Sequence, residues 1–127
     1  MERVLGRFSP QFYALMRIVV GLLFACHGAQ KLFGMFGVQH MPLASQMGLA
    51  GVIEFFGGLL IAIGFLAGTA AFIASGEMAA AYFKMHFPRG GVPIQNGGEL
   101  AVLYCFVFLF IASRGAGIWG VDRASRR

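Results

Sequence analysis

Four stretches of mostly apolar residues follow one another along the chain, separated by segments rich in glycine, proline or charged residues. They cover residues 12–32, 48–66, 69–86 and 98–113. A helix needs about 20 largely apolar residues to cross the hydrocarbon core of a bilayer. The pattern therefore predicts an all-α fold in which residues 1–127 form a single transmembrane domain, an antiparallel four-helix bundle.

The segments between these stretches predict how the helices connect. Gly68 is expected to end the second helix in a left-handed conformation, and Thr69 to cap the third. So short a connection makes the second and third helices antiparallel neighbours, packed through their glycine and alanine faces. The longer segment 33–47 is expected to lie at the membrane interface, and segment 87–97 contains two prolines that interrupt a helix.

Composition narrows the class of protein. Of the 127 residues, 58% are hydrophobic and 12% are charged, whereas roughly 25% are charged in an ordinary soluble domain. Two cysteines in an apolar context do not form the framework of a disulfide-stapled secreted module. A soluble enzyme, a disordered chain and a disulfide-rich module are therefore disfavoured, which leaves a small integral membrane protein.

The net charge of +5 comes largely from arginines that flank the apolar stretches rather than from one basic face. Such placement is typical of residues that orient membrane spans, and it argues against nucleic-acid binding. Under the positive-inside rule it predicts that both termini lie in the cytoplasm. The arginines near the two chain ends are Arg3, Arg7, Arg114, Arg123, Arg126 and Arg127.

Three of the five acidic residues, Glu54, Glu77 and Glu99, fall within the predicted spans. A charge at membrane depth costs about 2.5–3.5 kcal/mol, so such residues are candidates for function. At a rise of about 1.5 Å per helical residue, Arg17 and Glu77 both lie about 8–12 Å from the cytoplasmic side. The sequence therefore predicts a structural ion pair between Arg17 and Glu77 inside the bundle.

A second polar level is predicted under the outer surface, where the first and third spans end and the second and fourth begin. We expect a site there, with Glu54 as its key ionisable group because Glu54 is the deepest of the set. Four chain segments deliver polar side chains to this level, and neighbouring glycines leave room for a ligand. The set is His27, Gln30, Lys31, Glu54, His86 and Glu99.

Other interpretations of these residues stay open. Arg17 is close enough to the cytoplasmic end for its side chain to extend to water. Glu99 stands at a predicted helix N-terminus, where a carboxylate is favourable without any further role. Without a His-x₃-His or Cys-x₂-Cys spacing, no metal site is predicted. Interfacial anchoring or hydrogen bonding is the alternative for His27, Lys31, Lys84 and His86.

Five motifs, in order along the chain, resemble signatures of the DoxX family. Residues 27–34, HGAQKLFG, resemble its H-G-x-Q-K-L-F-G, and residues 54–60, EFFGGLL, resemble its E-x-x-G-G-L-L. His86, residues 97–99 (GGE) and residues 115–122 (GAGIWGVD) match its later signatures. The last motif has Gly-Ala-Gly where the family often has G-P-G, and Gly-Val-Asp where it often has S-L-D. The residue Glu77 is no part of the family pattern.

The resemblance implies a four-helix, multi-pass protein of the bacterial inner membrane. Family relatives include a subunit of a thiosulfate:quinone oxidoreductase, and others are linked to membrane redox complexes that handle oxidative stress, although most have no established reaction. This favours a redox-associated component, such as an oxidoreductase subunit, that binds a quinone or a similar lipophilic ligand. No ligand set for haem, flavin or an iron–sulfur cluster is evident in the sequence, so no intrinsic cofactor is predicted and electrons would come from a partner protein.

In this hypothesis three residues transfer protons and three bind the ligand. The first three are Glu54, His27 and Glu99, and the second three are Gln30, Lys31 and His86. The alternative is a non-enzymatic membrane bundle that binds or transports a small solute, or assists the assembly of a membrane complex. Four short spans would have to form a homo-oligomer to transport a solute. The expected partners are therefore membrane lipid, a redox partner protein and a second copy of the chain, and not nucleic acid.

Overall fold

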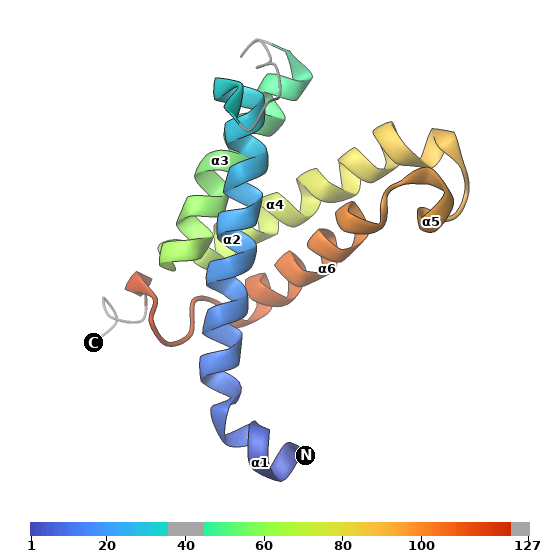
Figure 1. Ribbon diagram of the computed structural model, residues 1–127. Helices are drawn as coiled ribbons and strands as arrows, with labels where there is room; N and C mark the ends of the chain where they lie inside the picture. Colours follow the sequence, from blue (N-terminus) through green and yellow to red (C-terminus); the bar gives the residue numbers. More distant parts are fainter. Residues whose placement is uncertain (36–44, 123–127) are drawn as a thin grey trace.

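The computed structural model describes residues 1–35 and 45–122, and within them every regular element is helical (Figure 1). The all-α prediction is confirmed, and a helix covers most of each predicted apolar stretch. The elements are α1 (Glu2–Leu5), η1 (Gly6–Phe8), α2 (Ser9–Phe33), α3 (Gln46–Ile63), α4 (Ala67–Ala81), the π-helical η3 (Tyr82–His86), η4 (Phe87–Arg89), α5 (Pro93–Asn96) and α6 (Glu99–Arg114).

The four long helices form two pairs, α2 with α3 and α4 with α6, and α3 also packs against α4. The α4/α6 pair diverges from the α2/α3 pair toward α5 (Figure 1). Two helical stretches, Glu2–Phe33 and Gln46–Ile63, are long and apolar enough to cross a membrane. The arrangement is therefore two diverging helix pairs, of which the α2/α3 pair has the length of membrane spans.

Glycine backbone lies at the contact between α2 and α3. A Cβ atom added to Gly21 would lie 2.7 Å from the backbone nitrogen of Ala62, and one added to Gly58 would lie 2.5 Å from that of Ala25. Small residues let two helix backbones approach this closely. The glycine faces thus pack the first and second long helices together, whereas the sequence predicts that they pack the second against the third.

The alanine face of α4 packs in the core with α6. Ala71 and Ala74 are fully buried there, as are Phe108 and Ile111 of α6. Phe24 of α2 joins this core, because its ring centroid lies 4.6 Å from that of Phe108. Aromatic and alanine packing therefore connects the two helix pairs where they cross.

The turn between α3 and α4 comes earlier than the sequence predicts. Gly64 ends α3 with a φ of 76°, a left-handed conformation that favours glycine, and α4 begins at Ala67. The expectation that Gly68 ends this helix and Thr69 caps the next is wrong. The carboxylate of Asp122 instead accepts hydrogen bonds from the backbone nitrogens of Leu66 (2.9 Å) and Ala67 (3.0 Å). A residue from the far end of the chain thus supplies the cap that a local side chain was expected to supply.

Arg17 is completely buried, and its side chain binds the end of α3 on the other side of the same turn. Its Nη1 atom donates hydrogen bonds of 2.7 Å to the carbonyl oxygens of both Ile61 and Ala62, and Nη2 donates at 3.2 Å to that of Trp119. The last carbonyls of a helix have no partner within the helix, and a cation near them is favourable. Arg17 therefore caps the C-terminus of α3 and does not extend to water.

The predicted ion pair between Arg17 and Glu77 is wrong. The N-terminal turns of α2 project beyond the end of α3 (Figure 1), so Arg17 lies level with the last turn of α3 and not at mid-helix. Glu77 lies further along α4 and contacts Glu54 instead. A membrane depth for Arg17 that is counted from the start of α2 alone is therefore too large, because it ignores where α3 ends.

The first turns of α2 and the segment after α6 lie at the same end of the helix pairs, where Arg17 contacts Ile118 and Trp119. This agrees with antiparallel packing of successive long helices. The basic residues Arg123, Arg126 and Arg127, and most of the expected interfacial segment 33–47, lie outside the described residues.

Candidate ligand-binding cavity

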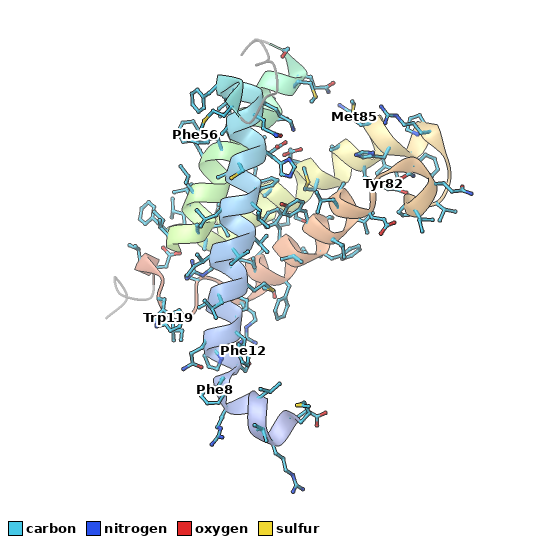
Figure 2. All side chains as sticks on the ribbon, viewed as in Figure 1. Phe8, Phe12, Phe56, Tyr82, Met85 and Trp119 are labelled. Carbon is cyan, nitrogen blue, oxygen red and sulfur yellow. The ribbon has the colours of Figure 1, made fainter. Side chains whose placement is uncertain are left out.

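A cavity of about 490 Å³ lies between the α2/α3 pair and the α4/α6 pair. Its walls come from all four long helices and from η3, where Met85 lies on the side that faces the α2/α3 pair (Figure 2). Its apolar lining includes Phe24 and Met78, and most of the lining surface is apolar. Pockets for small organic ligands have volumes of about 300–1,000 Å³ and a mostly apolar lining. The cavity therefore has the size and character of a small-molecule site.

One wall of the cavity carries an ion pair between α2 and α3. The Nζ atom of Lys31 lies 2.5 Å from Oε2 of Glu54, and the Glu54 side chain is only 2% exposed. Gly51 makes this possible, since a Cβ atom added there would lie 2.9 Å from Cβ of Lys31. A close helix contact thus places a lysine from the last turn of α2 against a carboxylate in the middle of α3.

Glu77 of α4 extends this polar wall. Its carboxyl group lies close enough to that of Glu54 to share a hydrogen bond, and it lines the cavity. Its Oε1 atom is buried and has no hydrogen-bond partner among the described residues. The wall therefore holds two carboxyl groups and one ammonium group, with one carboxyl oxygen unsatisfied.

Aromatic side chains line the cavity beside this polar wall. The imidazole of His27 meets the ring of Tyr104 edge to face, with 6.1 Å between their centroids. Tyr104 also lies 5.4 Å from Phe24, centroid to centroid. The arrangement offers flat apolar surface next to titratable groups, which suits a ligand with a planar ring.

The far side of the cavity is held by a buried asparagine. Asn96 is 2% exposed, and its Nδ2 donates to the hydroxyl of Tyr82 (3.1 Å) and the carbonyl of Gly90 (2.9 Å), while its Oδ1 accepts from the nitrogen of Gly98 (2.9 Å). The Nδ1 atom of His86 lies 3.3 Å from the Asn96 carbonyl oxygen. Asn96 thereby fixes the segment between η3 and α6, and with it the position of His86.

Comparison with known proteins identifies the family. The DoxX family model matches residues 12–87, which is more than half of the chain and includes His27, Lys31, Glu54 and His86. The chain belongs to the DoxX family. The resemblance seen in its motifs is thereby confirmed.

A protein of Haemophilus influenzae named "uncharacterized protein" is 41% identical to this DoxX protein over 125 residues, which cover 93% of each chain. No solved structure gives a significant match.

The structure brings together part of the site predicted for this DoxX protein. The predicted residues that line the cavity are His27, Lys31, Glu54 and His86. Gln30 is half-buried on α2 and Glu99 is exposed in the first turn of α6, and neither is among the lining residues. The position of Glu99 agrees with the alternative that it stabilises a helix N-terminus.

Three charged residues that line the cavity are not part of the predicted site: Glu77, Lys84 and Arg89. The sequence does indicate the position of Glu77 if the turn between α3 and α4 is placed at Leu66. Glu54 lies twelve residues before Leu66 and Glu77 eleven residues after it, so an antiparallel hairpin brings them to one level. Among the described residues, no group of three His, Cys, Asp or Glu side chains is placed to hold a metal ion.

Proposed function

We propose that this DoxX protein is a multi-pass inner-membrane protein, with both termini in the cytoplasm, that binds a quinone or a similar lipophilic carrier in the cavity. It would act there as a component of a membrane redox complex. The observation that carries the proposal is the cavity itself, which is mostly apolar and has its buried polar groups gathered on one wall.

The mouth of the cavity favours a ligand that dissolves in the bilayer. Leu49, Met85 and Leu100 line the cavity and are also large, exposed apolar residues. In a membrane such residues contact lipid chains rather than water. A carrier with an isoprenoid or alkyl tail can thus place its ring in the cavity while its tail stays in the lipid. A small polar solute would make no favourable contact with these apolar residues.

The polar wall suits the oxygens of a quinone ring. The ammonium of Lys31 and the imidazole of His27 line the cavity and can donate hydrogen bonds to the carbonyl oxygens of a quinone ring. The ring would pack against Phe24 and Tyr104. Reduction of a quinone takes up two electrons and two protons, so the carboxyl and imidazole groups would hold and move protons. A partner protein would supply the electrons.

Within this proposal His27 and Glu54 serve in proton transfer, and Lys31 and His86 in ligand binding. Gln30 and Glu99 are left out because they do not line the cavity. Glu54 is the central residue, since it is buried and contacts both Lys31 and Glu77. Its replacement by glutamine is therefore the most informative single change.

The test is thermal unfolding of the purified protein in detergent with increasing decylubiquinone. A ligand at a hundred times its Kd stabilises a protein by about 2.7 kcal/mol, and we expect a concentration-dependent rise in Tm. Glu54→Gln should abolish that rise, whereas Glu2→Gln, an exposed carboxylate on α1, should keep it. Stabilisation by a water-soluble solute with no effect of decylubiquinone would contradict the proposal and support the solute-binding alternative.

A further inference from the structure

The charges on the polar wall do not balance if both carboxyl groups are ionised. Glu54 and Glu77 share one nearby ammonium group, that of Lys31. The other cationic side chains that line the cavity, Lys84 and Arg89, are exposed, and neither forms an ion pair with Glu54 or Glu77. Glu77 is half-buried and its Oε1 atom is fully buried, and an ionised carboxylate there without its own cation is unfavourable in a low-dielectric site. One proton is therefore held between the two carboxyl groups.

The geometry indicates which residue holds this proton. Glu54 is paired with Lys31 at 2.5 Å and is 1% exposed, so the ammonium stabilises its ionised form. Within residues 1–35 and 45–122, Glu77 forms no ion pair, and the carboxyl of Glu54 is its hydrogen-bonding neighbour. A neutral Glu77 can donate its O–H to Glu54, which leaves its carbonyl-type oxygen free. The free oxygen corresponds to Oε1, which is buried and unpartnered.

A buried oxygen that can only accept a hydrogen bond selects a ligand that can donate one. The remaining titratable groups that line the cavity come from the other elements around Glu77: His27 on α2, His86 on η3 and Tyr104 on α6. The phenol of Tyr104 and the imidazoles can donate, but none is hydrogen-bonded to Glu77 Oε1. That atom is therefore open to a donor from the ligand.

We propose that Glu77 is a neutral carboxylic acid whose Oε1 accepts a hydrogen bond from a hydroxyl of the ligand. The site thereby binds the hydroxyl-bearing, reduced carrier, a hydroquinone, in preference to the quinone. This inference rests on the proposed function, and it goes further by naming the redox form of the ligand and the atom that selects it.

The experiment compares the affinities of decylubiquinol, kept reduced under nitrogen, and decylubiquinone for the purified protein. We expect the wild type to bind the quinol at least tenfold more tightly. Glu77→Gln should keep this preference, because its amide N–H can donate to Glu54 and its carbonyl can face the ligand. Glu77→Met removes the acceptor and should bring the two affinities together. Glu2→Gln is the matched control and should behave as the wild type.

Infrared spectroscopy in H₂O and D₂O tests the proton independently of any ligand and of the folding of Glu77→Met. The C=O stretch of a protonated carboxylic acid should be present in the wild type at neutral pH and absent from Glu77→Gln. Its absence from the wild type would overturn the neutral Glu77. Equal affinities for the two forms in wild type would overturn the selection of the quinol while leaving quinone binding intact. Binding of neither form would overturn the proposed function and the ligand preference with it.

Discussion

The Nζ atom of Lys31 lies 2.5 Å from Oε2 of Glu54 in the wall of the cavity. This pair joins the last turn of α2 to the middle of α3, at a point where Gly51 lets the two helices approach. Because Glu54 is 1% exposed, its carboxylate depends on the ammonium of Lys31 for charge compensation. The pair therefore links the stability of the α2/α3 contact to the electrostatics of the cavity.

Removing one member of this pair should cost more than removing both. Lys31→Met leaves Glu54 buried without its cation, and we expect a loss of about 3 kcal/mol in the free energy of unfolding. The double variant Lys31→Met/Glu54→Leu should recover much of that loss, since an apolar pair needs no compensating charge. Chemical unfolding of the wild type, the two single variants and the double variant in mixed micelles measures these free energies as a double-mutant cycle. Losses that simply add would contradict a direct interaction between the two side chains.

Two glycines, Gly28 of α2 and Gly57 of α3, should respond differently to replacement by alanine. A Cβ atom at Gly28 would overlap the backbone of Phe55 and lie 2.7 Å from the carbonyl oxygen of Gly51, whereas one at Gly57 would meet nothing within 4 Å. We expect Gly28→Ala to destabilise the protein by about 1–3 kcal/mol. Gly57→Ala should be neutral or stabilising by up to about 1 kcal/mol, through helix propensity. Equal Tm values for both variants would show that α2 and α3 are not in close contact.

The sequence predicts the helices because apolar length and the Gly and Pro positions are local signals. It does not predict the turn at Gly64, since nothing local distinguishes Gly64 from Gly68. The difference arises from Asp122 and Arg17, which close this turn from the two ends of the chain. Such long-range caps become evident only when the chain is folded.

Loss of the Arg17 side chain should destabilise the fold without changing the cavity. Arg17→Met leaves the carbonyl oxygens of Ile61 and Ala62 without their donors, and hydrogen bonds to a charged group contribute about 1.5–3 kcal/mol each. We expect a loss of about 3 kcal/mol or more, and a smaller loss for Arg17→Lys, which keeps the charge but not the forked geometry. Thermal unfolding in detergent measures both. A Tm for Arg17→Met like that of the wild type would contradict this assignment.

Asp122 should act as a helix cap. Asp122→Ala removes the acceptors for the backbone nitrogens of Leu66 and Ala67, and loss of such a cap costs about 1 kcal/mol. Asp122→Asn keeps one acceptor and should cost less. Hydrogen exchange at the first turn of α4 gives the local readout, with faster exchange in the alanine variant. Unchanged exchange at Ala67 would show that the cap is unimportant.

The sequence predicts the part of the site that lies on local motifs. His27, Lys31, Glu54 and His86 fall on motifs at the ends or inner faces of helices, and the structure brings them to one cavity. The sequence pairs Glu77 with Arg17 because the depth of each residue is counted along its own helix. The shared turn places Glu77 beside Glu54, a relationship between two helices that no single-helix count contains.

The most direct test of the central claim is the lipid that purifies with the protein. We predict that native mass spectrometry of the wild type, extracted in mild detergent from a quinone-containing bacterial membrane, shows one bound quinone-type lipid per chain. Glu54→Gln should lose that lipid, and Glu2→Gln should retain it. A wild-type protein that carries only phospholipid, with no quinone or quinol in its extract, would contradict the account.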